Sequence, residues 1–273
     1  MNRRGPEALP GASIRGRNNA PRVDRMTESE DREHISREGW VPVLEVDRDL
    51  AARLPADTVA AAVPFAVART QWLDPGRWRP IPPAAGDRPG HLGYLVLSGF
   101  LIRQVQVLKR PATELLGRGD LLLPWEPDRT EPFTAASRWE VLEPSCVAVL
   151  DRRFTAILSR WPEITVAVVS RAVSRSRALA LSLAIGQLVG IELRVLALLW
   201  HIAERWGTRR GEDTVLPVHL THQLLASLIS AQRATVTRAL RSLGEKGLVS
   251  RADDGLVVLH GEPPDDFGRT VGY

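Results

Sequence analysis

Cysteine is almost absent from this sequence, with Cys146 the single one among 273 residues. One cysteine excludes an intrachain disulfide, a cysteine-ligated zinc finger and an iron–sulfur cluster held within one chain. No apolar run reaches the roughly 18 residues that a membrane span needs, and the first residues lack the apolar core of a signal peptide. We therefore expect a cytoplasmic protein that makes no membrane contact.

Lysine is nearly absent as well, because Lys109 and Lys246 are the only two and arginine supplies the other basic residues. The formal net charge is only +4, so overall basicity indicates a nucleic-acid partner only weakly. A content of 44% hydrophobic and 25% charged residues is typical of globular proteins, and the length favours two domains.

The composition changes along the chain. Residues 1–38 mix charged, Gly, Pro and Asn residues without periodicity, which predicts a flexible tail. Residues 39–150 contain short apolar runs, such as GYLVLSGFLIRQVQVL and RWEVLEPSCVAVLD, with turns at Ser98-Gly99 and at Gly117 to Asp120. Many short strands at regular intervals predict an antiparallel barrel or sandwich for this segment.

Residues 151–188 lose these turn residues and predict a helical segment, in which Pro162 suits the first turn of a long helix. Small and apolar residues recur along it at spacings of three and four, namely Val166, Val169, Val173, Ser176, Ala180 and Leu183. This spacing is typical of a coiled-coil seam and predicts pairing with a second copy of the chain. The alternative is that the helix only packs on the barrel of its own chain. Gly186 and Gly190 predict a hinge at the end of this long helix.

Residues 189–262 predict a compact domain that ends in two helices and a strand pair, before a loose C-terminus at 263–273. Thr221 is placed as an N-cap for the first helix, and Ile229 to Ala231 form a turn of small residues. Residues 233–245, wound as a helix, gather Val236, Ala239, Leu240 and Leu243 on one side and mostly Arg and Thr on the other.

This helix pair has the pattern of a helix-turn-helix, whose second helix fits the major groove of DNA. Asp254-Gly255 suits the tip of a following hairpin, which would be a wing. Residues 220–251 hold five basic side chains against Glu245 alone, so this segment carries as much net charge as the whole chain. The alternative is an ordinary helical hairpin with a solvated basic face.

The segment LTHQLLASLISAQRATVTRALRSLGEKGLVS, followed by GLVVLHG, resembles the Crp/Fnr family of bacterial transcription regulators. The resemblance rests on Arg-x-Thr-Val-x-Arg in the second helix and extends upstream to GYLVLSGFLIR and LLGRGDLL. It implies an α+β fold with an N-terminal antiparallel, jelly-roll-like beta-roll, a long dimerisation helix and a C-terminal winged helix-turn-helix. The implied partners are double-stranded DNA, a second copy of the chain and RNA polymerase.

The resemblance also implies base or phosphate contacts by Arg233 and Arg238, with Thr235 close to the DNA backbone. Ala234 departs from the family pattern, in which many members have a glutamate there, so the preferred half-site should differ. The expected DNA-binding residues are Thr221, Gln232, Arg233, Ala234, Thr235, Thr237, Arg238, Arg241, Lys246 and Arg251.

The resemblance gives less for an effector. Members that bind cyclic nucleotides carry an acid and an arginine where this chain has approximately Pro124 and Ala136, so cyclic AMP is not expected. Glu126, Arg129 or Arg138 would substitute only in a redrawn loop. Arg171 and Arg175 on the long helix form either an anion site or a solvated basic face. We expect no cofactor; haem would need a ligand such as His91 or Cys146.

Catalysis has little support in the sequence. The sequence HIAE at 201–204 lacks the second histidine of a zinc-protease helix, and no phosphate-binding Gly-rich loop is present. We therefore expect a homodimeric, sequence-specific regulator of transcription with an unidentified effector or none, and not an enzyme. The competing hypothesis is a ligand-binding signalling module or enzyme whose winged helix contacts protein. Steep loss of DNA affinity with salt would separate the two.

Overall fold

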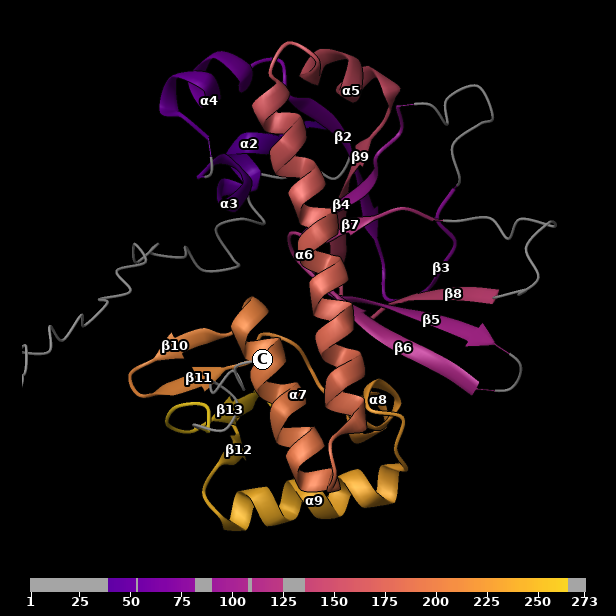
Figure 1. Cartoon of the computed structure of the whole chain (residues 1–273), viewed down its shortest axis with the longest axis vertical. Helices are drawn as coiled ribbons and strands as arrows, with labels where there is room; N and C mark the ends of the chain where they lie inside the picture. Colours follow the sequence, from indigo (N-terminus) through magenta and orange to yellow (C-terminus); the bar gives the residue numbers. More distant parts are fainter. Residues whose placement is uncertain (1–38, 53, 82–89, 108–109, 125–135, 265–273) are drawn as a thin grey trace, which may run out of the picture.

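The structure is a computed structural model that describes residues 39–52, 54–81, 90–107, 110–124 and 136–264. The tail predicted for residues 1–38 and most of the predicted loose C-terminus lie outside these residues. Figure 1 shows three parts around one long helix: small helices at one end, a strand-rich part behind and beside the helix, and a helical domain at the other end.

Two antiparallel sheets form the strand-rich part, which we call the beta-roll. The first sheet has the order β1-β2-β9-β4-β7, and the second has the order β3-β8-β5-β6. The strands of the first sheet are β1 (Trp40–Pro42), β2 (Val67–Leu73), β9 (Ser145–Leu150), β4 (Gly93–Ser98) and β7 (Leu121–Leu122). Those of the second are β3 (Gly76–Trp78), β8 (Ala136–Val141), β5 (Leu101–Val107) and β6 (Arg110–Leu116).

Residues from both sheets form one core of the beta-roll, in which Trp78 contacts Tyr94 and Trp139 edge-on. Both predicted turns are present. Gly99 has a φ of 79°, and a Cβ added there would lie 2.2 Å from the Ser145 hydroxyl, so only glycine fits. Gly119 has a φ of 85° in the turn before β7.

The expectation of strands throughout residues 39–150 is wrong for the segment after β1. This segment forms three short helices, α2 (Val43–Val46), α3 (Arg48–Ala51) and α4 (Ala56–Ala62). Within this segment the Asp47 side chain accepts the Leu50 backbone N–H and caps α3. Val43, Leu44 and Leu50 then pack in a second core with residues of the first sheet.

The predicted long helix begins where Pro162 was expected to start it. A short helix, α5 (Arg152–Leu158), precedes α6 (Pro162–Gln187), which runs along most of the molecule. Gly190, one of the two glycines of the predicted hinge, lies between α6 and α7 with a φ of 91°, and the hinge itself stays a prediction. Gly186 is helical, because α6 continues through it.

The last domain contains two longer helices, a short helix and a small sheet. Its elements are α7 (Ile191–Trp206), β10 (Thr208–Arg210), β11 (Asp213–Val215), α8 (His222–Leu228), α9 (Arg233–Glu245), β12 (Val249–Arg251) and β13 (Val257–Leu259). The basic segment at 208–213 pairs as a β10–β11 hairpin in the sheet β10-β11-β13-β12. In the described part of the chain, no helix is both long and apolar enough to cross a membrane.

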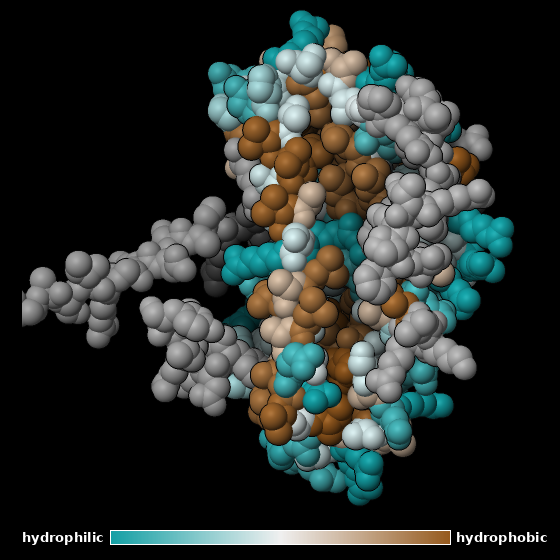
Figure 2. All heavy atoms as spheres, turned by 45° about the vertical axis from the view of Figure 1, so that its right-hand side comes forward, coloured by the Kyte–Doolittle hydropathy of each residue, from teal (hydrophilic) through white to brown (hydrophobic). Residues whose placement is uncertain are grey.

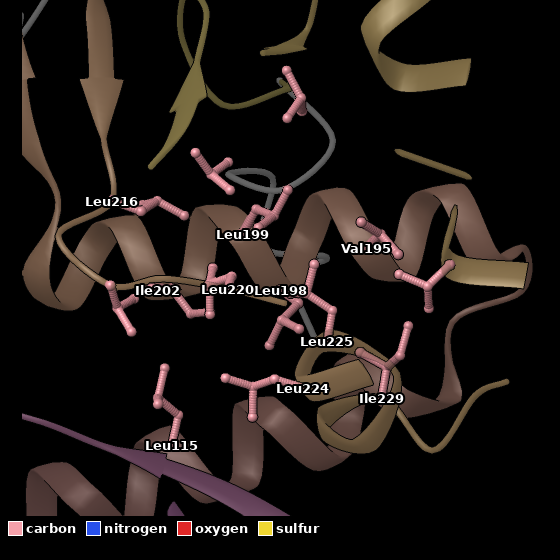
Figure 3. Packing of buried hydrophobic residues seen from close by; sticks show 14 of the residues in the cluster. Leu115, Val195, Leu198, Leu199, Ile202, Leu216, Leu220, Leu224, Leu225 and Ile229 are labelled. Atoms are coloured by element: carbon pink, nitrogen blue, oxygen red, sulfur yellow. The ribbon is translucent and has the colours of Figure 1, made fainter. Parts of the chain in front are cut away.

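A third core joins this domain to the beta-roll. Leu115 of β6, with Phe100 and Ile102, belongs to the same cluster as Ile202 of α7 and Leu224 of α8. Figure 3 shows Leu115 beside these side chains. The predicted α+β fold of beta-roll, long helix and winged helix-turn-helix is therefore confirmed, with the last domain docked on the beta-roll of its own chain.

Candidate nucleic-acid interface

Helices α8 and α9 meet through a tight turn. Thr221 caps α8 by accepting the backbone N–H of Leu224 at 3.1 Å, as the sequence predicts. In the turn, Ser230 has a φ of 53°, and the Ala231 N–H donates to the carbonyl of Ala226. The geometry is that of a helix-turn-helix, with α9 in the position of the second helix.

One side of α9 is fixed in the protein core. Val236, Ala239 and Leu243 are buried, Leu240 is partly buried, and the helix packs on α7 and α8. The predicted apolar sector of this helix is therefore confirmed, and the opposite sector faces solvent.

The solvent side of α9 carries two arginines whose charge no described residue neutralises. Arg233 and Arg238 are exposed, and their guanidinium groups make no ion pair or hydrogen bond with any described residue. Arg241, one turn beyond Arg238, instead pairs with Glu245 at 2.9 Å. An α-helix fits the major groove of DNA, where arginine side chains can bind guanine edges or phosphates.

Sequence reasoning missed His222, which links the two helices. Its Nδ1 lies 2.9 Å from the Thr237 hydroxyl, which donates to the carbonyl of Arg233. Burial lowers the pKa of His222, and the positive charges of Arg251 and Arg233 lower it further. Only the fold brings residues 222 and 237 together, so no local sequence signal could have identified this contact.

The other predicted DNA-binding residues lie around α9 on the same domain. Gln232 and Ala234 are exposed and Thr235 is partly buried. Lys246 pairs with Glu192 at the start of α7. Arg251 donates to the carbonyls of Gly255 at 2.7 Å and Leu220 at 2.8 Å, so it fastens the β12–β13 wing to the segment before α8.

The predicted effector residues that the structure describes, Arg138, Arg171 and Arg175, are not gathered at one place. Glu126 and Arg129 lie outside the described residues. Arg171 points to Asp47, with its Nη2 2.6 Å from Asp47 Oδ1. Arg138 is exposed and lines a groove of about 240 Å³ with Arg77 and Arg79.

Arg175 reaches from α6 into the beta-roll. It makes two hydrogen bonds to Glu114 at 2.8 and 3.0 Å and one to the carbonyl of Leu121 at 3.0 Å. Arg103 also pairs with Glu114 at 2.8 Å. Arg171 and Arg175 therefore hold carboxylates of their own chain, and the alternative of a solvated basic face does not apply to these two mostly buried side chains.

Cys146 lies in β9, fully buried, and burial raises the pKa of its thiol to about 12. Because the thiolate is the reactive form, we expect no reaction with Ellman's reagent in the folded protein at pH 8. One thiol per chain should react once guanidinium chloride unfolds the protein, which absorbance at 412 nm would measure. Rapid reaction without denaturant would instead indicate an accessible, redox-active thiol.

In sequence, residues 193–262 match the family of Crp-like helix-turn-helix domains. The C-terminal domain of this chain is therefore a Crp-like helix-turn-helix domain. No curated protein matches the sequence of the chain. A domain of this kind supports a role as a DNA-binding regulator of transcription.

Solved structures agree with this assignment in fold. This chain resembles a CooA variant from Carboxydothermus hydrogenoformans with a TM-score of 0.54 and 17% identity, over 74% of this chain and 88% of that one. A cyclic nucleotide-binding domain containing protein from Listeria monocytogenes gives 0.55 and 13%, over 69% and 87%. The c-di-GMP responsive regulator CLP of Xanthomonas campestris gives 0.51 and 18%, over 76% and 100%.

Within the described ranges, no three His, Cys, Asp or Glu side chains lie together as a metal site would require.

Proposed function

We propose that this protein is a Crp/Fnr-family homodimer that reads a near-palindromic DNA site with two copies of α9 and does not require cyclic AMP. Its half-site centres would be about one helical turn of DNA, roughly 34 Å, apart. We place this activity in the cytoplasm, with RNA polymerase as a further partner. No observation favours the competing role as an enzyme or a protein-binding module.

The observation that carries DNA reading is the pair of unpaired arginines on α9. Arg233 and Arg238 stand on the exposed face of a helix whose other face is held in the core. Arg233 and Arg238 can bind DNA without breaking an ion pair to a described residue, whereas Arg241 would first have to break its ion pair with Glu245. We therefore propose Arg233 and Arg238 as the principal base-reading residues.

Dimerisation is supported by the exposed side of α6. Every residue of the predicted seam is exposed, and the exposed fractions of Val166, Val173 and Leu183 are 65%, 65% and 70%. Figure 2 shows hydrophobic side chains in a band along one face of the molecule. A long apolar stripe on a helix is unfavourable in water, and a second copy of the helix would cover it.

Independence from cyclic AMP is supported by the interior of the beta-roll. Glu114 is already paired by Arg103 and Arg175, and Asp47 by Arg171. A cyclic phosphate would have to displace a carboxylate from these arginines. We propose that these carboxylates of the chain itself neutralise the arginines, as the phosphate of an effector would otherwise do.

Selection from random duplex DNA tests this function. Purified protein would be incubated at near-physiological salt, alone, with cyclic AMP and with cyclic di-GMP, and the bound sequences and their affinities measured. We expect one near-palindromic motif without ligand, and affinity that falls steeply as salt rises. A motif that appears only with a nucleotide would contradict ligand independence. Weak binding without any motif would contradict the reading role.

A further inference from the structure

The turn Gly117–Asp120 of the beta-roll, which we call the roll turn, holds two consecutive residues of α7. Asp120 is buried, accepts the Gly117 N–H at 2.9 Å and lies 2.6 Å from Arg205 Nη2. The indole N–H of Trp206 donates to the carbonyl of Arg118 at 3.0 Å. One charged and one neutral contact therefore tie the DNA-binding domain to one short turn.

Packing around these contacts leaves little freedom. Trp206 meets Phe100 of the beta-roll edge-on, with 5.3 Å between ring centroids. A Cβ added to Gly117 would lie 2.7 Å from Phe100 and 2.9 Å from Trp206, so the backbone of the roll turn lies directly against both rings. The Arg205 guanidinium also stacks on the Trp206 ring at 3.9 Å.

The other side of the roll turn is fastened to α6 and to the N-terminal helices. Arg118 donates to the carbonyl of Val46 at 2.9 Å. A Cβ added to Gly119 would lie 3.1 Å from the guanidinium of Arg171, which is held by Asp47. The roll turn thus fixes the position of α7 relative to α6, the helix that carries the exposed seam.

Helix α7 in turn positions α9. The two helices pack on each other in the shared core, and Lys246, just after α9, pairs with Glu192 of α7. The docked arrangement leaves Arg233 and Arg238 exposed, so it presents the reading face. A rigid path of contacts therefore leads from α6 through the roll turn and α7 to α9.

We propose that Asp120 and the Arg118 carbonyl, acting through Arg205 and Trp206, are positioning elements that set the distance between the two α9 helices and so select the half-site spacing. The spacing part of this inference rests on the proposed homodimer. A fixed distance between the two α9 helices favours DNA with one half-site spacing, because binding to any other spacing would distort or break these contacts.

Two conservative variants test the proposal. Asp120→Asn keeps an oxygen that can accept the Gly117 N–H but removes the charge facing Arg205. Trp206→Phe keeps an aromatic ring against Phe100 but removes the N–H donated to Arg118. The control is Arg209→Gln, which breaks the exposed pair of Arg209 with Glu262 in the same domain, 2.6 Å apart.

Affinity would be measured for the selected site and for sites with its half-sites one base pair closer or farther apart. Wild-type protein should prefer one spacing. In both variants we expect the affinity for the preferred spacing to fall about three- to tenfold, because fewer molecules hold the binding geometry. The differences in affinity between the three spacings should become smaller. The affinity of both variants for random DNA should equal that of the wild-type protein. The Arg209→Gln control should keep the wild-type affinity at every spacing.

Hydrogen exchange without DNA tests the contacts independently of dimer function. We expect faster exchange of α7 amides in both variants, with exchange in β4 and β9 unchanged. A folded variant with wild-type spacing preference and wild-type α7 exchange would overturn the proposal. If Asp120→Asn does not fold, the result for Trp206→Phe decides whether the proposal holds. A wild-type protein without any spacing preference would contradict the homodimer, while the exchange result would still judge the coupling.

Discussion

Replacing Arg238 with alanine is expected to weaken binding to the selected site and to remove base preference at one position of each half-site. A bidentate contact between arginine and guanine contributes about 1–3 kcal/mol of discrimination, which is about a five- to 150-fold change in affinity per contact. Arg238 is exposed and unpaired among the described residues, so nothing in the protein compensates for the lost contact. Repeating the selection with the variant would measure both effects.

Arg241→Ala is the matched control for this prediction. Arg241 lies on the same helix with its side chain 82% exposed, but its guanidinium is paired with Glu245. We expect a smaller loss of affinity and an unchanged motif. Lys246→Ala should at most lower affinity for all sequences alike, since it would remove a phosphate contact. An Arg238→Ala protein with the wild-type motif and affinity would refute the role assigned to Arg238.

Introducing a carboxylate into the exposed seam of α6 is expected to abolish dimers. Val169→Asp or Leu183→Asp would place a charge where two copies of the helix exclude water, and burying an unpaired charge is strongly unfavourable. Loss of the second half-site contact should then lower DNA affinity about a hundredfold or more. Size-exclusion chromatography with light scattering would give the mass, and titration of the selected DNA site would give the affinity.

Ser174→Asp provides the control on the same helix. Ser174 is exposed but lies outside the seam, so its variant should remain dimeric and bind DNA normally. Circular dichroism should show the same helix content in all three variants. A dimeric Val169→Asp protein would place the subunit contact elsewhere on the surface.

The parts of the fold that the sequence predicted are those with local causes. Thr221 as a cap, the small residues at 229–231 and the apolar positions of α9 act within a few residues of one another, so the helix-turn-helix is visible in the chain itself. The exposure of the predicted seam positions along α6 follows from helical periodicity, which gathers them on one side, and their role in pairing stays a prediction.

The missed features depend on contacts between segments far apart in sequence. Asp47 and Arg171 are separated by 124 residues, and Asp120 and Arg205 by 85. A buried arginine looks the same in sequence as a solvated one until its partner is known, so Arg171 and Arg175 could not be assigned. The helices at 43–62 were missed because short apolar runs fit either a strand or a helix.

If the proposed independence from cyclic AMP holds, the arginines that pair with Glu114 in the beta-roll would constrain how this protein could gain a nucleotide-dependent response. Placing an acid at position 124 and an arginine at position 136 would not suffice, because Glu114 would still compete with the incoming phosphate for Arg103 and Arg175. Glu114 would have to be replaced as well, and that change alone would leave two mostly buried arginines without their carboxylate. A protein that has lost Glu114 but binds no anion in its place is expected to be less stable than the present one.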